Sequence, residues 1–386
     1  GALSLGRETG DAFGRTIEEV DASGNATVMS YDALNRLASI RSPEVEVRDT
    51  RQGCDAEAVL TRPTVSYTYT LTDEVETETD QNGGVTSYEY DALGRITKVI
   101  GPGQEVLRTV EFGDDARPYP DRRVASSDGL GNWEVSWLDG MDRAWKIVAA
   151  DSTEKLITYD RQGRKASVTM PWGEVIRNTY SVLNEVVEVQ RELGGTVVTS
   201  RFLYDARGRR IQEEDGDGQV TTNRYDAAGR LLEQTLGHPS LITPLLTARH
   251  QYDRSGLLTE QTIAGVRTAF ERDELGRVVR EQIGFNGRDA LRVLEHTWTA
   301  TDQPATTTNA LGERVANTYD ALGRLTRTDV QTVNPDGSVS DHGARHYGYD
   351  AAGNLTQERD ESGLATCRVY DELGREVATT PPGLGT

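Results

Sequence analysis

A six-residue motif that returns along the chain constrains the fold more than any other feature. Residues 90–95 read Tyr-Asp-Ala-Leu-Gly-Arg, and the pattern Tyr-Asp-x-x-Gly occurs eight times in the 386 residues. Looser copies bring the number of first-position residues, here called anchors, to sixteen, and neighbouring anchors lie 21 residues apart in seven cases. The anchors are residues 10, 31, 69, 90, 112, 138, 159, 180, 204, 225, 252, 272, 298, 319, 349 and 370. Such short-period repetition predicts a repeat architecture rather than one large core.

The hexamer has the chemistry of a strand end followed by a turn. Tyr favours strands, Asp can bond the backbone two residues on, and Gly supplies a positive φ. Where the fifth position lacks Gly, it holds Asn or Asp, the residues that best tolerate the left-handed region after Gly. Examples of these substitutes are Asn35, Asp142, Asn184 and Asp302. We therefore expect the fifth position to be left-handed in every copy.

A second turn lies about half-way through each repeat. From Asp205 to Asp215 and from Asp350 to Asp360 is ten residues, and the later Asp of each pair opens a Gly-containing turn. Between turns, Thr, Val and Tyr alternate with polar residues, as strands do. The sequence predicts an all-β chain of antiparallel hairpins with about two strands per 21-residue repeat, each needing its neighbours to bury a face.

The hexamer resembles the YD repeat of the Rhs (rearrangement hotspot) family, found in bacterial polymorphic toxins, the B and C components of Tc toxins, and teneurins. The resemblance spans essentially all of 1–386. It implies a continuous antiparallel β-hairpin spiral that forms the wall of a hollow shell, commonly around a C-terminal toxin domain. Family shells usually end in a plug with an Asp-Pro self-cleavage motif, and no Asp here precedes Pro. We therefore expect a section of a longer wall.

One array with no second domain is expected over 1–386. Longer connections, expected to leave the wall as loops, interrupt the rhythm, and in the first of them residues 55–60 are compatible with a helical turn. The connections lie near 41–66, 101–127, 237–249, 284–297 and 330–346.

Charge and cysteine content narrow the possible partners. The formal net charge is −20, which argues against a nucleic-acid partner and disfavours anionic membranes. No apolar run approaches membrane-spanning length. Cys54 and Cys367 are the only cysteines, too few for a disulfide framework, so their role and the redox compartment stay open.

The repeated Tyr and Arg side chains allow a binding role and a packing role. Eleven of fifteen Tyr are anchors, and Tyr67, Tyr88 and Tyr347 lie two residues before one. They could stack sugars or hold unfolded cargo, but regular spacing favours packing between neighbouring repeats. Arg at the sixth position could bind anions; a bond to a turn carbonyl or to an Asp of the adjacent repeat is favoured. Nine copies carry it: Arg36, Arg95, Arg143, Arg164, Arg209, Arg230, Arg277, Arg324 and Arg375.

Two further patterns suggest metal sites and are better explained otherwise. His342 and His346 have chelating spacing on a helix, but on a strand they would be about 13 Å apart. The run 215–219 opens like a calcium loop, yet Val220 occupies the required Gly position, so an ordinary turn is favoured. No cofactor, metal or catalytic residue is expected.

The predicted function is a structural, non-catalytic section of an Rhs/YD-repeat shell that encloses or scaffolds a toxin or effector domain. Its partners would be that domain or other shell segments, and the resemblance implies a secreted or extracellular bacterial toxin. The alternative is an extracellular adhesion or carbohydrate-binding surface, with glycans as partners. The residues expected to build the repeats are Tyr31, Asp32, Tyr90, Asp91, Gly94, Arg95, Tyr159, Asp160, Gly163, Arg164, Tyr204, Asp205, Gly208, Arg209, Tyr225, Asp226, Gly229, Arg230, Tyr319, Asp320, Gly323, Arg324, Tyr349, Asp350, Gly353, Tyr370, Asp371, Gly374 and Arg375.

Overall fold

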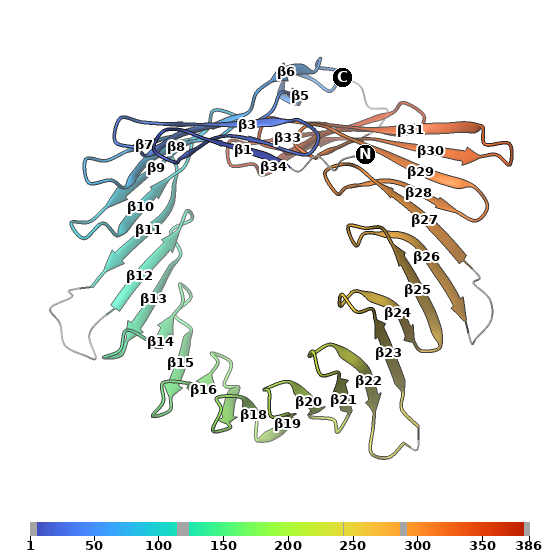
Figure 1. Cartoon of the computed structure of the whole chain (residues 1–386). Coiled ribbons are helices and arrows are strands. Elements are labelled where there is room, and N and C mark those ends of the chain that lie inside the picture. The colour runs from blue at the N-terminus through green and yellow to red at the C-terminus, as the bar shows by residue number, and fades with distance from the viewer. Residues whose placement is uncertain (1–5, 114–122, 242, 286–291, 382–386) are drawn as a thin grey trace. The chain divides into compact units, whose positions relative to one another are not determined.

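A computed structural model describes residues 6–113, 123–241, 243–285 and 292–381. The chain divides into two compact units. Unit 1 combines Gly1–Arg108 with Leu294–Thr386, and unit 2 is Thr109–Val293. Antiparallel strands build each unit (Figure 1). Within the described ranges there is one short 3₁₀ helix and no α-helix, and no helix there is long and apolar enough to cross a membrane.

Unit 1 contains the first and the last strands of the chain, together with the 3₁₀ helix η1. Its elements are β1 (Arg7–Gly10), β2 (Thr16–Val20), β3 (Ala26–Tyr31), β4 (Leu37–Arg41), β5 (Val45–Val47), η1 (Thr50–Gln52), β6 (Val59–Thr61), β7 (Thr64–Tyr69), β8 (Val75–Thr79), β9 (Val85–Tyr90), β10 (Ile96–Ile100), β28 (Pro304–Asn309), β29 (Glu313–Tyr319), β30 (Leu325–Val333), β31 (Val339–Tyr349), β32 (Leu355–Arg359), β33 (Ala365–Tyr370) and β34 (Glu376–Thr380).

Unit 2 consists of the middle strands, and β11 (Val106–Phe112) and β27 (Arg292–Trp298) run across the two unit boundaries. The strands of unit 2 are β12 (Arg123–Asp128), β13 (Trp133–Leu138), β14 (Ala144–Val148), β15 (Glu154–Tyr159), β16 (Lys165–Thr169), β17 (Val175–Tyr180), β18 (Val186–Leu193), β19 (Thr196–Tyr204), β20 (Arg210–Glu214), β21 (Val220–Tyr225), β22 (Leu231–Gly237), β23 (Leu246–Tyr252), β24 (Leu258–Ile263), β25 (Val266–Arg272) and β26 (Val278–Phe285).

Strands pair antiparallel with their neighbours in the chain, as β20 does with β19 and β21. All sixteen anchors are the last residue of a strand. At the anchor the register shifts: Arg224 faces Glu233 while Tyr225 faces Leu231, which leaves one extra residue on the returning strand. The prediction of an all-β chain of antiparallel hairpins, two strands to a repeat, is confirmed.

The sheet is thinly packed over most of its length, and most strand residues are only half-buried. In unit 1 the deepest burial lies around residues 45–63, where Val45 is 2% exposed and Pro63 is below 2%. There the chain folds across strands from its other end. Elsewhere a single layer of strands offers each side chain few neighbours, so hydrogen bonds and ion pairs must hold the repeats together.

The longer connections differ in structure. Residues 41–66 hold the β5–β6 pair, and the helical turn expected at 55–60 is wrong: η1 occupies 50–52, where Asp49 accepts the N–H of Arg51 as an N-cap. Residues 330–346 mostly form the β30–β31 hairpin rather than a loop. The connection at 237–249 is confined to 238–245 between strands. In 101–127 and 284–297, residues 114–122 and 286–291 lie outside the described part of the chain.

Candidate functional site

In the part of the chain that the structure describes, the fifth position of the hexamer is left-handed as predicted; the fifth position of the copy at 112 lies outside the described residues. Gly94 has φ 74°, and the substitutes Asn35 and Asn184 have φ 68° and 70°. Asp142 and Asp302 both have φ 61°. The prediction that these Asn and Asp residues replace Gly for a conformational reason is confirmed, since each closes the same turn.

The Asp of the hexamer ties its own turn together. In the copy at 90–95, one carboxylate oxygen of Asp91 accepts the N–H groups of Leu93 (2.9 Å) and Arg95 (3.0 Å), and the other accepts Nε of Arg95 (2.7 Å). The backbone closes the loop, because Gly94 N–H donates to the carbonyl of Asp91 (3.0 Å). The bond from Arg Nε to Asp Oδ2 recurs at Asp11, Asp32, Asp139, Asp160, Asp205, Asp226, Asp273, Asp320 and Asp371.

These hydrogen bonds stabilise the charged carboxylate. The hydrogen bond from the Arg209 side chain is the largest cause that lowers the pKa of Asp205 to about 2. In other copies the backbone N–H of the sixth-position Arg is the largest cause of a lowered pKa, at Asp32, Asp91, Asp160, Asp226 and Asp371. The turn is therefore built around an ionised Asp.

The Arg also reaches the next repeat. The guanidinium of Arg164 lies 4.4 Å from the ring centroid of Tyr180, and its Nη1 donates to the Ser181 carbonyl (3.2 Å) and to Asn184 Oδ1 (2.9 Å). Arg209 does the same, 4.8 Å from the Tyr225 ring and 3.0 Å from the Asp226 carbonyl. We call this arrangement the cross-repeat clamp. The stacking recurs in the pairs Arg15–Tyr31, Arg36–Tyr69, Arg143–Tyr159, Arg230–Tyr252 and Arg324–Tyr349.

The anchor Tyr binds the preceding repeat through its hydroxyl group. Tyr225 OH donates to the carbonyl of Arg210 (3.0 Å), and Tyr180 OH donates to that of Lys165 (2.9 Å). In each case the acceptor directly follows the sixth position of the preceding hexamer. The same bond is made by Tyr31, Tyr69, Tyr90, Tyr159, Tyr204, Tyr252, Tyr319, Tyr349 and Tyr370.

The predicted partners of the Arg row need one correction. The bond to a turn carbonyl is present, but the carboxylate partner belongs to the same hexamer and not to the adjacent repeat, because a tight turn brings positions two and six together. Arg36 is an exception that binds both Asp32 (2.7 Å) and Asp73 of the next turn (2.8 Å). Arg15 makes the clamp contacts too, although the sequence count of nine omitted it.

The anchor residues are distributed one hairpin at a time along both units and do not gather in one pocket. Where Arg is replaced after Tyr349, Asn354 donates to Asp350 in its place (2.8 Å). Among the three tyrosines that lie two residues before an anchor, Tyr88 donates to Glu78 (3.4 Å), and Tyr67 lies opposite the same Glu78. Burial is the largest cause that raises the pKa of both phenols.

The two patterns with metal-like spacing form ordinary strand and turn structure. His342 and His346 lie on β31, and the Nε2 of His342 pairs with the Thr332 hydroxyl (2.8 Å). Asp215 closes a turn by accepting the N–H groups of Asp217 (3.0 Å) and Gln219 (2.8 Å). Across the described ranges, no group of three or more His, Cys, Asp or Glu is placed to hold a metal ion.

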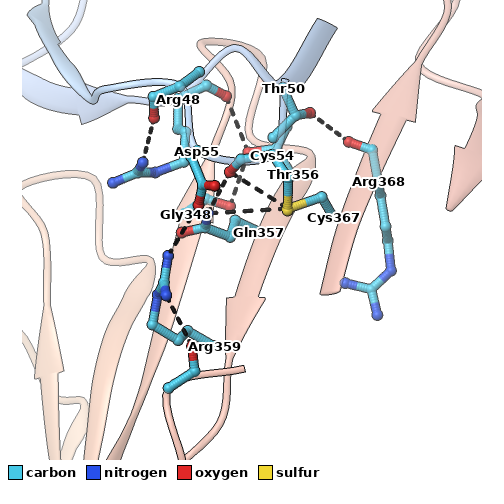
Figure 2. Close-up of a disulfide and its surroundings, with 12 residues drawn as sticks. Arg48, Thr50, Cys54, Asp55, Gly348, Thr356, Gln357, Arg359, Cys367 and Arg368 are labelled. Carbon is cyan, nitrogen blue, oxygen red and sulfur yellow. Dashed lines mark hydrogen bonds and ion pairs between the residues drawn. A yellow bond between two sulfur atoms is a disulfide. The ribbon is translucent and has the colours of Figure 1, made fainter. Parts of the chain in front are cut away.

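One feature of unit 1 has no counterpart in the repeats. Residues 45–61, here called the strap, lie across β31 to β33 and are joined to them by a disulfide between Cys54 and Cys367, whose Cα atoms are 5.6 Å apart (Figure 2). The backbone N–H of Arg48 donates to the Tyr349 carbonyl (2.8 Å). The Thr50 hydroxyl donates to the Arg368 carbonyl (2.6 Å).

The sheet also donates to the strap. Gln357 Nε2 binds the Cys54 carbonyl (2.7 Å), and the Thr356 hydroxyl binds the Arg48 carbonyl (3.0 Å). Thr356, Gln357 and Cys367 are 3%, 5% and 3% exposed, so the strap covers them almost completely. This site is the most buried part of unit 1.

Sequence reasoning missed the disulfide. Two cysteines 313 residues apart carry no pairing signal, because nothing in the repeat spacing shows which strands the strap crosses. A weak signal was Gly348, which precedes an anchor where other copies carry Thr68, Glu89 or Arg224. A Cβ at Gly348 would lie 3.2 Å from Cδ of Arg48, so the missing side chain makes room for the strap.

A polar cavity of about 440 Å³ opens beside the strap, lined by residues that include Asp49, Arg51, Asp350 and Asp371. Three of its carboxylates have partners: Asp49 binds Arg51, and Asp350 and Asp371 accept N–H groups of their own turns. These three carboxylates therefore take part in hydrogen bonds that hold the local structure.

Comparison with known proteins agrees with this geometry. The model of the RHS Repeat family matches residues 10–44, 69–106, 204–238 and 349–386. Over 96% of its length the chain is 25% identical to double-stranded DNA deaminase toxin A of Burkholderia cenocepacia, and over 61% it is 27% identical to toxin subunit YenC1 of Yersinia entomophaga. It spans about a quarter of each relative, 26% and 23%.

Solved structures share the fold. A crystal structure of TcdB2-TccC3-Cdc42 matches 98% of this chain with a TM-score of 0.65 at 16% identity, over 21% of its own chain. The Tc holotoxin pore of Photorhabdus luminescens matches 96% with a TM-score of 0.59 at 15% identity, over 22% of its chain. The repeated hexamers and these matches together support the Rhs, or YD-repeat, family for this chain.

Proposed function

We propose that this chain is a section of wall in an Rhs/YD-repeat shell that encloses or scaffolds a toxin or effector domain. The observation that carries the proposal is the cross-repeat clamp. Each polar group of the hexamer has a structural partner: the carboxylate closes its own turn, and the guanidinium and the phenol fasten one repeat to the next. A wall needs this repeated local fastening, and it needs no reaction centre.

The relatives support the toxin part of the proposal. They are named as a toxin, a toxin subunit and, for a protein of Dickeya dadantii that is 26% identical over 61% of this chain, a probable deoxyribonuclease. Those names describe proteins of which this chain matches between 18% and 26%, so an enzymatic activity need not lie in the repeats. The partners would be an effector domain or further shell segments, in a secreted bacterial toxin.

Protease protection tests this function. In the full-length gene product, segments outside the repeats should resist trypsin much longer than the same segments expressed alone. Breaking two clamps with Arg164→Lys and Arg209→Lys should shorten that protection, while Arg224→Lys, at an exposed ion pair with Glu233, should not. Equal cleavage of the enclosed and the isolated segment would reject enclosure.

The alternative, an adhesion or carbohydrate-binding surface, is less well supported. One face of the Tyr180 ring is covered by Arg164 and its hydroxyl is bonded to the Lys165 carbonyl, which leaves less of the ring for a sugar to stack on. Specific glycan binding by the purified chain, lost in Tyr180→Ala, would favour this alternative over the wall.

A further inference from the structure

The strap is held to the sheet by one covalent bond and by a few hydrogen bonds. At its β6 end the strap buries little apolar surface: Val59 and Leu60 are 62% and 65% exposed. The side chain of Asp55 is 93% exposed, and its ion pair with Arg359 is 3.7 Å long. Exposed pairs of this kind contribute little. Without the disulfide, only a few hydrogen bonds would keep this part of the strap in place.

The disulfide is also the one bond in the chain that a change of redox environment can break. The sequence has two cysteines, and both are in it. Such bonds persist in oxidising surroundings and are reduced in a cytosol kept reducing by dithiol proteins and glutathione. The bond spans 313 residues and ties the N-terminal part of unit 1 to its C-terminal part. Whether the disulfide is oxidised or reduced therefore decides whether those two parts are linked covalently or only by non-covalent contacts.

We propose that the Cys54–Cys367 disulfide is a redox latch for the strap. In oxidising surroundings the bond holds residues 48–58 against β32 and β33. A dithiol reductant opens it and frees this part of the strap, which uncovers Thr356 and Gln357. The proposal does not depend on what the wall encloses.

The two sulfur atoms differ in a way that sets the direction of the exchange. Cys54 is half-buried in the strap, whereas Cys367 is 3% exposed beneath it. The reductant thiolate therefore attacks Sγ of Cys54, forming a mixed disulfide, and Sγ of Cys367 leaves as a thiolate. Gln357 Nε2, 3.9 Å from that sulfur, faces the developing charge. The second thiol of the reductant, as its thiolate, then displaces Cys54, leaving an oxidised dithiol and, after protonation, two cysteine thiols.

The opened latch should be visible as local loss of protection. Arg48 and Arg51 are trypsin sites inside the strap, and Arg177 is a site in β17 of unit 2. The experiment follows cleavage at these three sites in the intact chain by mass spectrometry, with and without dithiothreitol. We expect the reductant to speed cleavage after Arg48 and Arg51 about tenfold or more, and to leave cleavage after Arg177 unchanged.

The matched control is the double variant Cys54→Ser with Cys367→Ser. It should be cleaved rapidly after Arg51 with or without dithiothreitol. The latch is overturned if titration finds two free thiols in the air-oxidised chain, or if the reductant changes cleavage in the strap by less than twofold. It is also overturned if cleavage after Arg177 rises in parallel, since the effect would then be global unfolding.

Discussion

Repeats 159–230 of unit 2 and the strap of unit 1 use opposite ways of joining distant residues. In the repeats, Arg164 fastens to Tyr180 only sixteen positions on, and the same arrangement returns from hairpin to hairpin. The strap occurs once and joins residues 313 positions apart. Each clamp stabilises only the two repeats that it joins, so removing one clamp should destabilise only those neighbouring repeats. The strap has no duplicate, so its loss affects the whole of unit 1.

The largest expected effect therefore comes from the strap. Cys54→Ser with Cys367→Ser should lower the unfolding free energy of unit 1 by about 2–4 kcal/mol, because a long loop is no longer closed in the unfolded chain. Unit 2 should be unaffected. Denaturant titration followed by hydrogen exchange reports the two units separately. A change in unit 1 below about 0.5 kcal/mol would mean that the strap adds no more than a surface contact.

Breaking a single clamp should lower the unfolding free energy less than removing the disulfide. Arg164→Lys keeps the positive charge but cannot bind Asp160, the Ser181 carbonyl and the Tyr180 ring together, so we expect a loss of about 1–2 kcal/mol in unit 2. Arg224→Lys is the control, because its side chain is 69% exposed in an ion pair with Glu233. Equal effects of the two substitutions in chemical denaturation would show that the clamp is only a surface charge.

Placing a Cβ at the left-handed fifth position of a turn should lower the unfolding free energy by about 1 kcal/mol. Gly94→Ala places a Cβ at φ 74° and strains the turn, whereas Asn35→Gly at φ 68° relieves the same strain and should be neutral or slightly stabilising. Gly140 has no neighbour within 4 Å of an added Cβ and is not left-handed, so Gly140→Ala should be tolerated. Thermal unfolding of the three variants separates these outcomes, and a harmless Gly94→Ala would refute the turn assignment.

The smallest expected effect is the pH dependence of stability that the Asp205 carboxyl contributes, which appears only in acid. The pKa of Asp205 is lowered to about 2 in the folded chain, from about 3.9 in an unfolded one. Its contribution to stability is therefore complete above pH 4 and is lost as pH falls toward 2. The denaturation midpoint of unit 2 should stay level from pH 7 to 5 and drop below about 4. In Asp205→Asn that acid-dependent drop should be smaller, and a wild-type midpoint that already falls between pH 7 and 5 would contradict the assignment.

The same contrast explains what could be predicted from the sequence. The turns were predictable because their chemistry is local: Asp91, Gly94 and Arg95 lie within five residues and each copy checks the others. For the sixth-position Arg, the bond to a turn carbonyl could be predicted. The carboxylate partner could not, since the spacing alone does not say whether it comes from the same turn or the next. The strap was not predictable, because the pairing of Cys54 with Cys367 depends on which C-terminal strands lie beside residues 45–61 within unit 1.

Coupling between the sixth-position Arg of one repeat and the anchor Tyr of the next is what makes the hexamer a joint between repeats. A double-mutant cycle with Arg209→Lys and Tyr225→Leu measures this coupling directly in unit 2. We predict that the two single losses overlap, with a coupling free energy of about 0.5–1 kcal/mol. Fully additive losses would show that the two side chains act independently, and the hexamer would then be a row of separate turns rather than a joint between repeats.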